Sequence, residues 1–174
     1  MQTRLEVDYN EFKNIDALDE KILSALMIDA RVKWAALADK FGISAPAIAD
    51  RVRRLEKAGL IVGYTAQLDA LALGFDLTAF VSVTLSHPQH RASFIDYVQE
   101  NPAVQSCHHV VGEGDYLLKI RCRNTAELEH LLSEELKALP GIVQTRTTIS
   151  LRSLKDTTVI SLSTPELEPD APDL

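Results

Sequence analysis

The chain has 174 residues, of which 46% are hydrophobic and 25% are charged, and its net charge is −7. This composition is typical of a globular protein with room for two small domains, and it excludes a chain that is disordered throughout. No apolar run approaches the roughly 20 residues of a membrane span, and the N-terminus lacks the pattern of a signal peptide. We therefore expect a cytoplasmic protein without a membrane partner.

The N-terminal 15 residues are polar and acidic and are predicted to form an arm. From Asp16 onward, apolar residues recur with helical spacing, and the first turn carries Asp19 and Glu20, as the helix dipole favours. The apolar face of this first helix consists of Leu18, Ile22, Ala25 and Leu26.

The stretch from Trp34 to Tyr64 is predicted to form two helices joined by a turn, followed by a β hairpin. Gly42 ends the first of these helices, Ser44 caps the second, and Gly59 follows its end. The two hairpin strands are expected at residues 60–62 and 64–66. Residues 16–66 are therefore predicted to form a winged helix-turn-helix domain.

The second of these helices has a basic outer face and small residues at its N-terminus. Between Arg31 and Tyr64, seven Lys and Arg residues stand against three Asp and Glu residues, a local charge of +4 in an acidic chain. Such a basic region is typical of a module that binds double-stranded DNA through phosphates, with a slim helix end entering the major groove. The alternative is an ordinary solvated helix in a winged helix that binds protein. The candidate DNA-binding residues are Ser44, Ala45, Ala47, Asp50, Arg51, Arg53, Arg54 and Lys57.

A connector at residues 67–76 leads to a second domain, predicted at residues 77–163. Its elements alternate as strand, helix, strand, strand, helix, strand, which is the ferredoxin-like (ACT-like) βαββαβ order of an α+β protein. The predicted strands cover 78–85, 104–111, 116–122 and 143–151, with a candidate fifth strand at 158–162. The first helix is expected to begin at Pro88, and Thr125 is expected to cap the second. Phe80 falls on the sheet face without helices, so we expect a homodimer through this face. Residues 164–174 form an acidic, proline-rich tail with the composition of a disordered segment.

The residues most often used in catalysis and metal binding offer no such site here. Cys107 and Cys122 are too few for a disulfide framework or a metal site, and we expect buried thiols. His108 and His109 are adjacent in a strand and point to opposite faces, so they cannot easily share a metal ion. The sequence therefore predicts a protein that is not an enzyme and has no cofactor and no bound metal.

Several runs of residues resemble the leucine-responsive regulatory protein/AsnC family of transcriptional regulators. They are Arg51-Val52-Arg53-Arg54-Leu55-Glu56-Lys57-Ala58-Gly59-Leu60-Ile61, Gly112-Glu113-Gly114-Asp115-Tyr116-Leu117-Leu118, Leu139-Pro140-Gly141-Ile142 and Thr145-Arg146-Thr147. The resemblance covers about residues 15–162. It implies a regulator that forms dimers and often octamers, and that wraps or bends DNA in response to an amino acid bound between dimers.

The resemblance implies that the turn at residues 112–115 belongs to an effector site. Its glycines let backbone N–H groups approach a carboxylate, and the Asp115 side chain can accept an ammonium group. The alternative is a plain hairpin turn that uses glycine for its backbone conformation. The candidate effector-binding residues are Gly112, Glu113, Gly114, Asp115, Tyr116, Thr145 and Thr147.

Two other functions share this architecture. Sirohaem decarboxylases resemble it, but they carry a histidine motif where this chain has Asp115-Tyr116-Leu117-Leu118. An acidic adaptor protein with a winged helix that does not bind DNA would show no salt-dependent DNA affinity. The sequence leaves open the effector, the operator, the sign of regulation and the choice between dimer and octamer.

Overall fold

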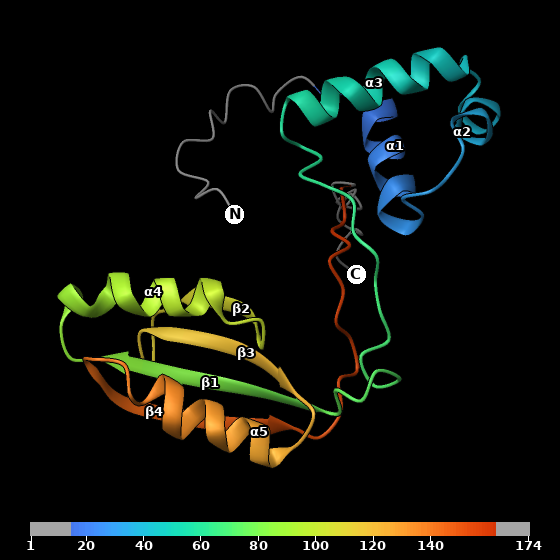
Figure 1. Ribbon diagram of the computed structural model, residues 1–174. Coiled ribbons are helices and arrows are strands. Elements are labelled where there is room, and N and C mark those ends of the chain that lie inside the picture. Colours follow the sequence, from blue (N-terminus) through green and yellow to red (C-terminus); the bar gives the residue numbers. More distant parts are fainter. Residues whose placement is uncertain (1–14, 163–174) are drawn as a thin grey trace, which may run out of the picture. The chain divides into compact units, whose positions relative to one another are not determined.

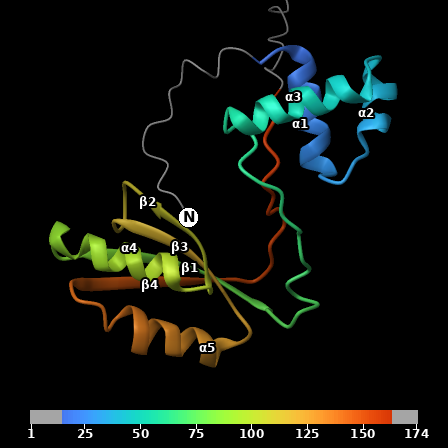
Figure 2. The same ribbon diagram turned by 45° about the horizontal axis from the view of Figure 1, so that its top comes forward.

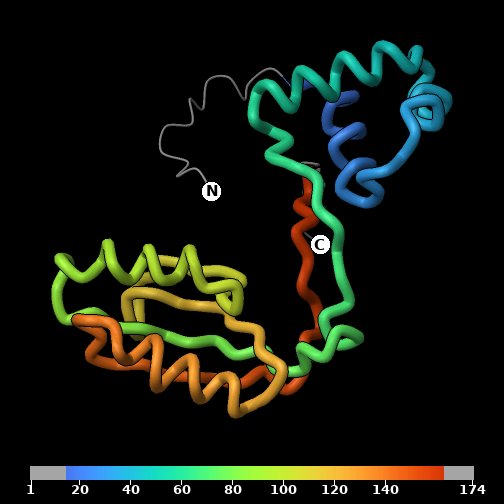
Figure 3. The backbone as a smooth tube through the Cα atoms, in the orientation of Figure 1, coloured from blue at the N-terminus to red at the C-terminus, as the bar shows by residue number. Residues whose placement is uncertain are grey.

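The structure is a computed structural model that describes residues 15–162 (Figure 1; Figure 3 traces the same backbone). The chain divides into two compact units, and each is described by itself. Residues 15–67 and 156–162 belong to the helical unit, and residues 68–155 form the sheet unit. Within these residues no helix is long and apolar enough to span a membrane. The predicted acidic tail and the first 14 residues of the predicted arm lie outside the described residues.

Three helices make up the helical unit: α1 (Ala17–Ile28), α2 (Trp34–Phe41) and α3 (Ala45–Lys57). Gly42 ends α2 in the left-handed region, at φ 70°, which a glycine adopts without steric cost. The helices enclose a small core of Ile22, Leu26, Leu37, Ala38, Ile48 and Val52. The predicted helix-turn-helix is therefore confirmed, with each helix close to its expected place.

The predicted wing hairpin is not formed in the described part of the chain. Residues 60–62 and 64–66 contain no strand. The backbone leaves α3 through Gly59, at φ 72°, and the N–H of Leu60 donates to the carbonyl of Leu55 at 3.0 Å, which is a Schellman ending. The Tyr64 hydroxyl then donates to Glu56 Oε1 at 2.8 Å, which holds this extended segment to α3. An isolated two-stranded hairpin is marginally stable in water, so alternation in two three-residue runs was too weak a basis for the prediction.

The sheet unit contains four antiparallel strands, and their spatial order β2-β3-β1-β4 is that of a ferredoxin-like fold (Figures 1 and 2). The strands are β1 (Leu77–Leu85), β2 (Val104–His109), β3 (Tyr116–Cys122) and β4 (Ile142–Ser150). A short 3-10 turn, η2 (Pro88–His90), precedes α4 (Arg91–Glu100), and α5 (Thr125–His130) continues as the π-helical segment η3 (Leu131–Leu136). The predicted α+β architecture is confirmed.

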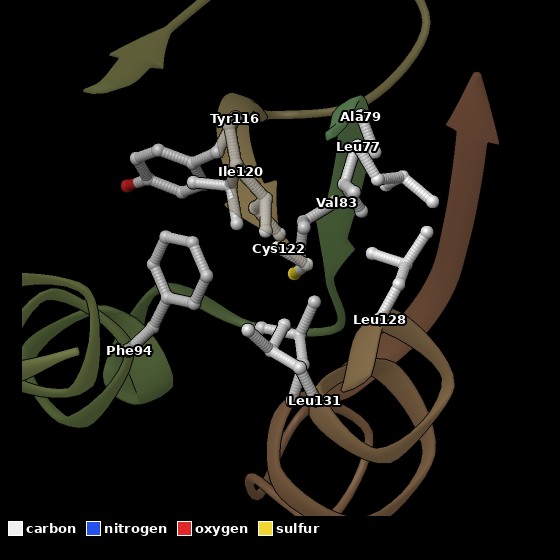
Figure 4. Close-up of a cluster of buried hydrophobic side chains, with 12 residues drawn as sticks. Leu77, Ala79, Val83, Phe94, Tyr116, Ile120, Cys122, Leu128 and Leu131 are labelled. Carbon is white, nitrogen blue, oxygen red and sulfur yellow. The ribbon is translucent and has the colours of Figure 1, made fainter. Parts of the chain in front are cut away.

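One face of the sheet is buried under both helices. Side chains in β1 alternate, so that Leu77, Ala79, Val81 and Val83 are buried. Figure 4 shows Phe94 of α4, Leu128 of α5 and Leu131 of η3 pointing to the same side of the strands. The other face has no cover within the sheet unit, and Phe80 and Leu117 are 39% and 37% exposed there.

Smaller details of the sheet unit differ from the sequence prediction. Asn124, rather than Thr125, caps α5 by accepting the N–H of Glu127 at 2.9 Å. Residues 158–162 form no strand. Burial raises the pKa of both thiols, but only Cys122 is fully buried and Cys107 is half-buried.

Candidate DNA-binding and effector-binding sites

The N-terminus of α3 is a turn of small side chains. Ser44 is the N-cap, and its Oγ accepts the backbone N–H of Ala47 at 3.3 Å. Pro46 lies in the first turn, where its missing N–H costs no hydrogen bond. The structure thus brings Ser44, Ala45 and Ala47 together at a helix end slim enough to approach base edges in a major groove.

Three cations on α3 are exposed to solvent: Arg53, Lys57 and Arg54, the last of which also contacts α1. Arg53 Nη1 lies 3.0 Å from Asp50 Oδ1, and these side chains are 73% and 70% exposed. A surface pair of this kind contributes about 1 kcal/mol or less, so a DNA phosphate can replace the carboxylate at little cost. Arg53 and Lys57 are therefore available to an anionic partner.

The other two arginines of α3 contact α1. Arg51 Nη1 lies 2.6 Å from Asp16 Oδ2 and 2.8 Å from Asp19 Oδ1, while Arg54 Nη2 lies 2.5 Å from Asp19 Oδ2. The hydrogen bond from Arg51 holds the pKa of the Asp16 carboxyl below its ordinary value, and the same bond raises the pKa of Arg51. Arg51 therefore has a role inside the helical unit, which sequence reasoning did not assign to it.

Asp19 is a residue whose role at this site sequence reasoning missed. It was assigned to the helix dipole of α1, yet it is completely buried and accepts hydrogen bonds from two arginines. A signal was present in the spacing, because Asp16 and Asp19 are three residues apart, as are Arg51 and Arg54. Asp16 is the N-cap of α1 and Asp19 lies in its first turn, so these two acids can meet two bases that share one side of α3.

The turn at residues 112–115 is fixed to the end of β1. The N–H of Asp115 donates to the carbonyl of Val83 at 2.8 Å, and Asp115 Oδ2 accepts the N–H of Leu85 at 2.7 Å. Gly114 has φ 98°, and a side chain there would collide with the hydroxyl of Ser82. The Asp115 carboxylate thus already holds the turn, with one oxygen committed to the backbone.

Glu113 adds two contacts on the open face of the sheet. Its carbonyl accepts the Ser82 hydroxyl, and its carboxylate forms an exposed ion pair with Arg146 of β4. Ser82 and Arg146 lie opposite each other in the β1–β4 ladder. Neither was among the candidate residues, although Arg146 lies within one of the family-like runs.

The remaining effector candidates face away from this group. Tyr116 is buried at 5% exposure, and its ring packs against Phe94 and His109 with centroid distances of 4.7 and 5.1 Å. Thr145 and Thr147 lie opposite Val83 and Val81 in the ladder and so point to the side of the sheet that carries the helices. Within this chain, the structure does not bring these three side chains together with Glu113.

A hydrogen-bonded group of side chains joins α4 to η3 in the sheet unit. The Tyr97 hydroxyl donates to Glu135 Oε2 at 3.1 Å, and Asn101 Nδ2 lies 2.9 Å from both of these oxygens. Burial and the Glu135 carboxylate raise the pKa of Tyr97. The group borders a hollow of about 500 Å³, and its polar atoms pair with one another, so we assign it to helix packing.

Comparison with known proteins gives matches to both units. The model of the AsnC-type helix-turn-helix domain matches residues 15–56, and that of the Lrp/AsnC ligand-binding domain matches residues 78–160. A leucine-responsive regulatory protein of Rhizobium meliloti is 41% identical over 144 residues, which are 82% of this chain and 92% of the relative. A proline dehydrogenase transcriptional activator of Rhodobacter capsulatus is 37% identical over 80% of this chain and 92% of its own length.

Two solved structures have folds similar to that of this chain. AsnC of Escherichia coli has a TM-score of 0.79 and 30% identity, and the match covers 83% of this chain and 97% of that one. A transcriptional regulator of Neisseria meningitidis, solved in complex with L-Met, has a TM-score of 0.83 and 28% identity. The match covers 86% of this chain and 97% of that one.

Proposed function

Because the chain belongs to the Lrp/AsnC family of transcriptional regulators, we propose that it binds double-stranded DNA through α3 as a homodimer, and that an amino acid alters how its dimers assemble. The proposed setting is the cytoplasm, where DNA and free amino acids are both present.

The end of α3 is the observation that supports DNA binding most directly. Its slim, capped N-terminus can reach base edges, while the exposed Arg53 and Lys57 can neutralise phosphates on either side. This division between base contacts and phosphate contacts is that of helix-turn-helix proteins. The relatives are transcriptional regulators, which agrees with this use of the helix.

The open face of the sheet supports the homodimer. Phe80 of β1 and Leu117 of β3 are large apolar side chains that remain more than a third exposed on adjacent strands. A symmetric dimer would bury Phe80 and Leu117 against their own copies and would carry two copies of α3, which suits a palindromic operator. Dimers that assemble further, to tetramers or octamers, would gain avidity on adjacent sites.

The ion pair between Glu113 and Arg146 supports an amino acid as the effector. An α-amino acid carries one carboxylate and one ammonium group, and this exposed pair offers one cation and one anion on the open face of the sheet. Gly112 adds no side chain to this turn, and no atom lies within 4 Å of the place that a Cβ would take there. The Neisseria meningitidis regulator was solved with L-Met, which supports the same class of effector here.

The test is DNA binding by fluorescence anisotropy, first with a random duplex library and then with the selected duplex across a salt series. We expect affinity to fall steeply with salt, because phosphate contacts release counterions. Repeating the titration with each of the twenty amino acids should identify one that changes affinity or assembly size. If no duplex binds at low salt, the proposal fails, and tetrapyrrole turnover and protein partners become the functions to measure.

A further inference from the structure

The Asp19 carboxylate is buried between two arginines of α3. It has no exposed surface, its Oδ1 accepts Arg51 at 2.8 Å, and its Oδ2 accepts Arg54 at 2.5 Å. Oδ2 also accepts the backbone N–H of Asp16 at 3.2 Å. Both oxygens are therefore held in place, so whatever Asp19 binds is held in place as well.

The two arginines differ in what they leave available. The Arg51 side chain is 29% exposed, and its Nη1 is shared between Asp16 and Asp19. The Arg54 side chain is 56% exposed and contacts Asp19 through Nη2. A guanidinium has five N–H donors in one plane, so Arg54 keeps donors for a second anion while Asp19 fixes the plane.

Arg54 also lies beside the cations already assigned to DNA. It is three residues from Lys57, so these side chains are neighbours on the helix surface, and it directly follows Arg53. A phosphate bound by Lys57 would therefore lie near Arg54.

We propose that Asp19 is a positioning residue for DNA binding, which holds Arg54 in the orientation that contacts a backbone phosphate. The inference rests on the proposed function. A long, exposed side chain loses rotamer freedom when it binds, and this ordering weakens affinity by roughly two- to tenfold per side chain. Asp19 removes this cost because Arg54 is already ordered in the free protein.

Simple electrostatics predicts the opposite sign for the loss of this carboxylate. Asp19 is an acid close to the surface that would meet DNA, so its neutralisation alone should strengthen binding to a polyanion. Positioning predicts that the same change weakens binding. The sign of the change in DNA affinity therefore distinguishes positioning by Asp19 from simple electrostatic repulsion.

The experiment compares Asp19→Asn with Glu20→Gln in the full chain, on a duplex selected by the wild-type protein. Both variants remove one negative charge from α1, but the Glu20 side chain has no hydrogen bond or ion pair within residues 15–162. We expect Glu20→Gln to bind as tightly as wild type or slightly more tightly, and Asp19→Asn to bind roughly two- to tenfold more weakly. Arg54→Gln should reduce the slope of log affinity against log salt by about 1, as the loss of one phosphate contact requires.

The double variant that combines Asp19→Asn with Arg54→Gln distinguishes positioning of Arg54 from a general loss of stability. If Asp19 acts through Arg54, then Asp19→Asn should weaken binding in the wild-type background and have little further effect in the Arg54→Gln background. An equal loss in both backgrounds, or an Asp19→Asn variant that binds as tightly as Glu20→Gln, would overturn the proposal. A wild-type protein that binds no duplex would overturn the proposed function with it.

A second measurement covers the case in which Asp19→Asn loses its helical circular dichroism. The guanidinium N–H signals of wild-type Arg54, assigned in the NMR spectrum by their loss in Arg54→Gln, should be resolved in the free protein and should shift when the duplex is added. Signals that do not respond to saturating duplex would show that Arg54 contacts Asp19 alone, and would equally overturn the proposal.

Discussion

The two units are held together by different kinds of contact. The hydrophobic core of the sheet unit has twelve buried, largely apolar residues, whereas that of the helical unit has six. In the helical unit, the Asp19 carboxylate adds ion pairs between α1 and α3. Apolar packing tolerates small rotations and exchanges of shape. Charged hydrogen bonds have a fixed direction, so they set the rotation of α3 about its own axis. A helix that must meet DNA in one orientation benefits from the second kind of contact.

The largest loss of stability is expected from a substitution in the apolar core of the sheet unit. Phe94 is 1% exposed and packs on the ring of Tyr116 at 4.7 Å. Phe94→Ala should lower the unfolding free energy of this unit by about 3–5 kcal/mol, through lost burial and the cavity left behind. Hydrogen exchange of the β3 amides measures this unit separately from the helices. Leu68→Ala, at a 73% exposed position of the same unit, is the control. An equal loss for both variants would contradict an apolar core centred on Phe94.

The corresponding change in the helical unit is Asp19→Ala. It leaves Arg51 and Arg54 without their shared partner, but both are partly exposed and can regain water. We therefore expect Asp19→Ala to lower the unfolding free energy of this unit by about 2 kcal/mol. This is less than the roughly 3–5 kcal/mol typical of a broken buried ion pair. Hydrogen exchange of the α3 amides at low and high salt measures the effect. Glu20→Ala serves as the matched control, and an equal loss there would mean that the ion pairs do not close this unit.

The sequence predicted what depends on local pattern. Helical spacing, the Ser44 cap and the Gly42 ending located α2 and α3, and alternation located the four strands of the sheet. Both errors in strand content, at residues 60–66 and 158–162, involve short runs whose pairing would need a partner strand. Contacts between distant residues were not accessible in this way. The spacing of Asp16 with Asp19 and of Arg51 with Arg54 shows which residues share one side of a helix, but not that α1 and α3 pack together. The role of Arg146 likewise depends on which strands become neighbours, and composition and periodicity do not show this.

A further loss of stability is expected from a substitution in the turn of the candidate effector site. Gly114 combines φ 98° with a collision between any added side chain and Ser82, so Gly114→Ala should cost about 1–3 kcal/mol. Gly74 has a similar φ of 79° but nothing within 4 Å, and Gly74→Ala should cost less. Urea unfolding of both variants measures the difference. If the two losses are equal, the close approach of the turn to β1 contributes nothing.

The smallest effect concerns the pH range in which the ion pairs of the helical unit act. Arg51 lowers the pKa of Asp16 in the folded protein, so the charged form of Asp16 is favoured by folding. The stabilisation is therefore fully present above the ordinary carboxyl pKa, about 4, and is lost as the pH falls through the lower folded value. Asp16→Asn keeps an N-cap side chain for α1, because asparagine caps a helix about as well as aspartate, and so removes mainly the charge.

We accordingly expect wild type to exceed Asp16→Asn slightly in its urea midpoint at neutral pH, and the two midpoints to converge at strongly acidic pH. Asp39→Asn removes a carboxylate that has no ion pair within residues 15–162, so its difference from wild type should lack this pH profile. Asp16 is exposed, and solvent screening keeps the effect small. An Asp16 difference that persists unchanged into acid would assign the contribution of this residue to capping of α1. In that case Asp19 alone would carry the buried ionic contact that distinguishes the helical unit from the sheet unit, whose Glu113–Arg146 pair is exposed.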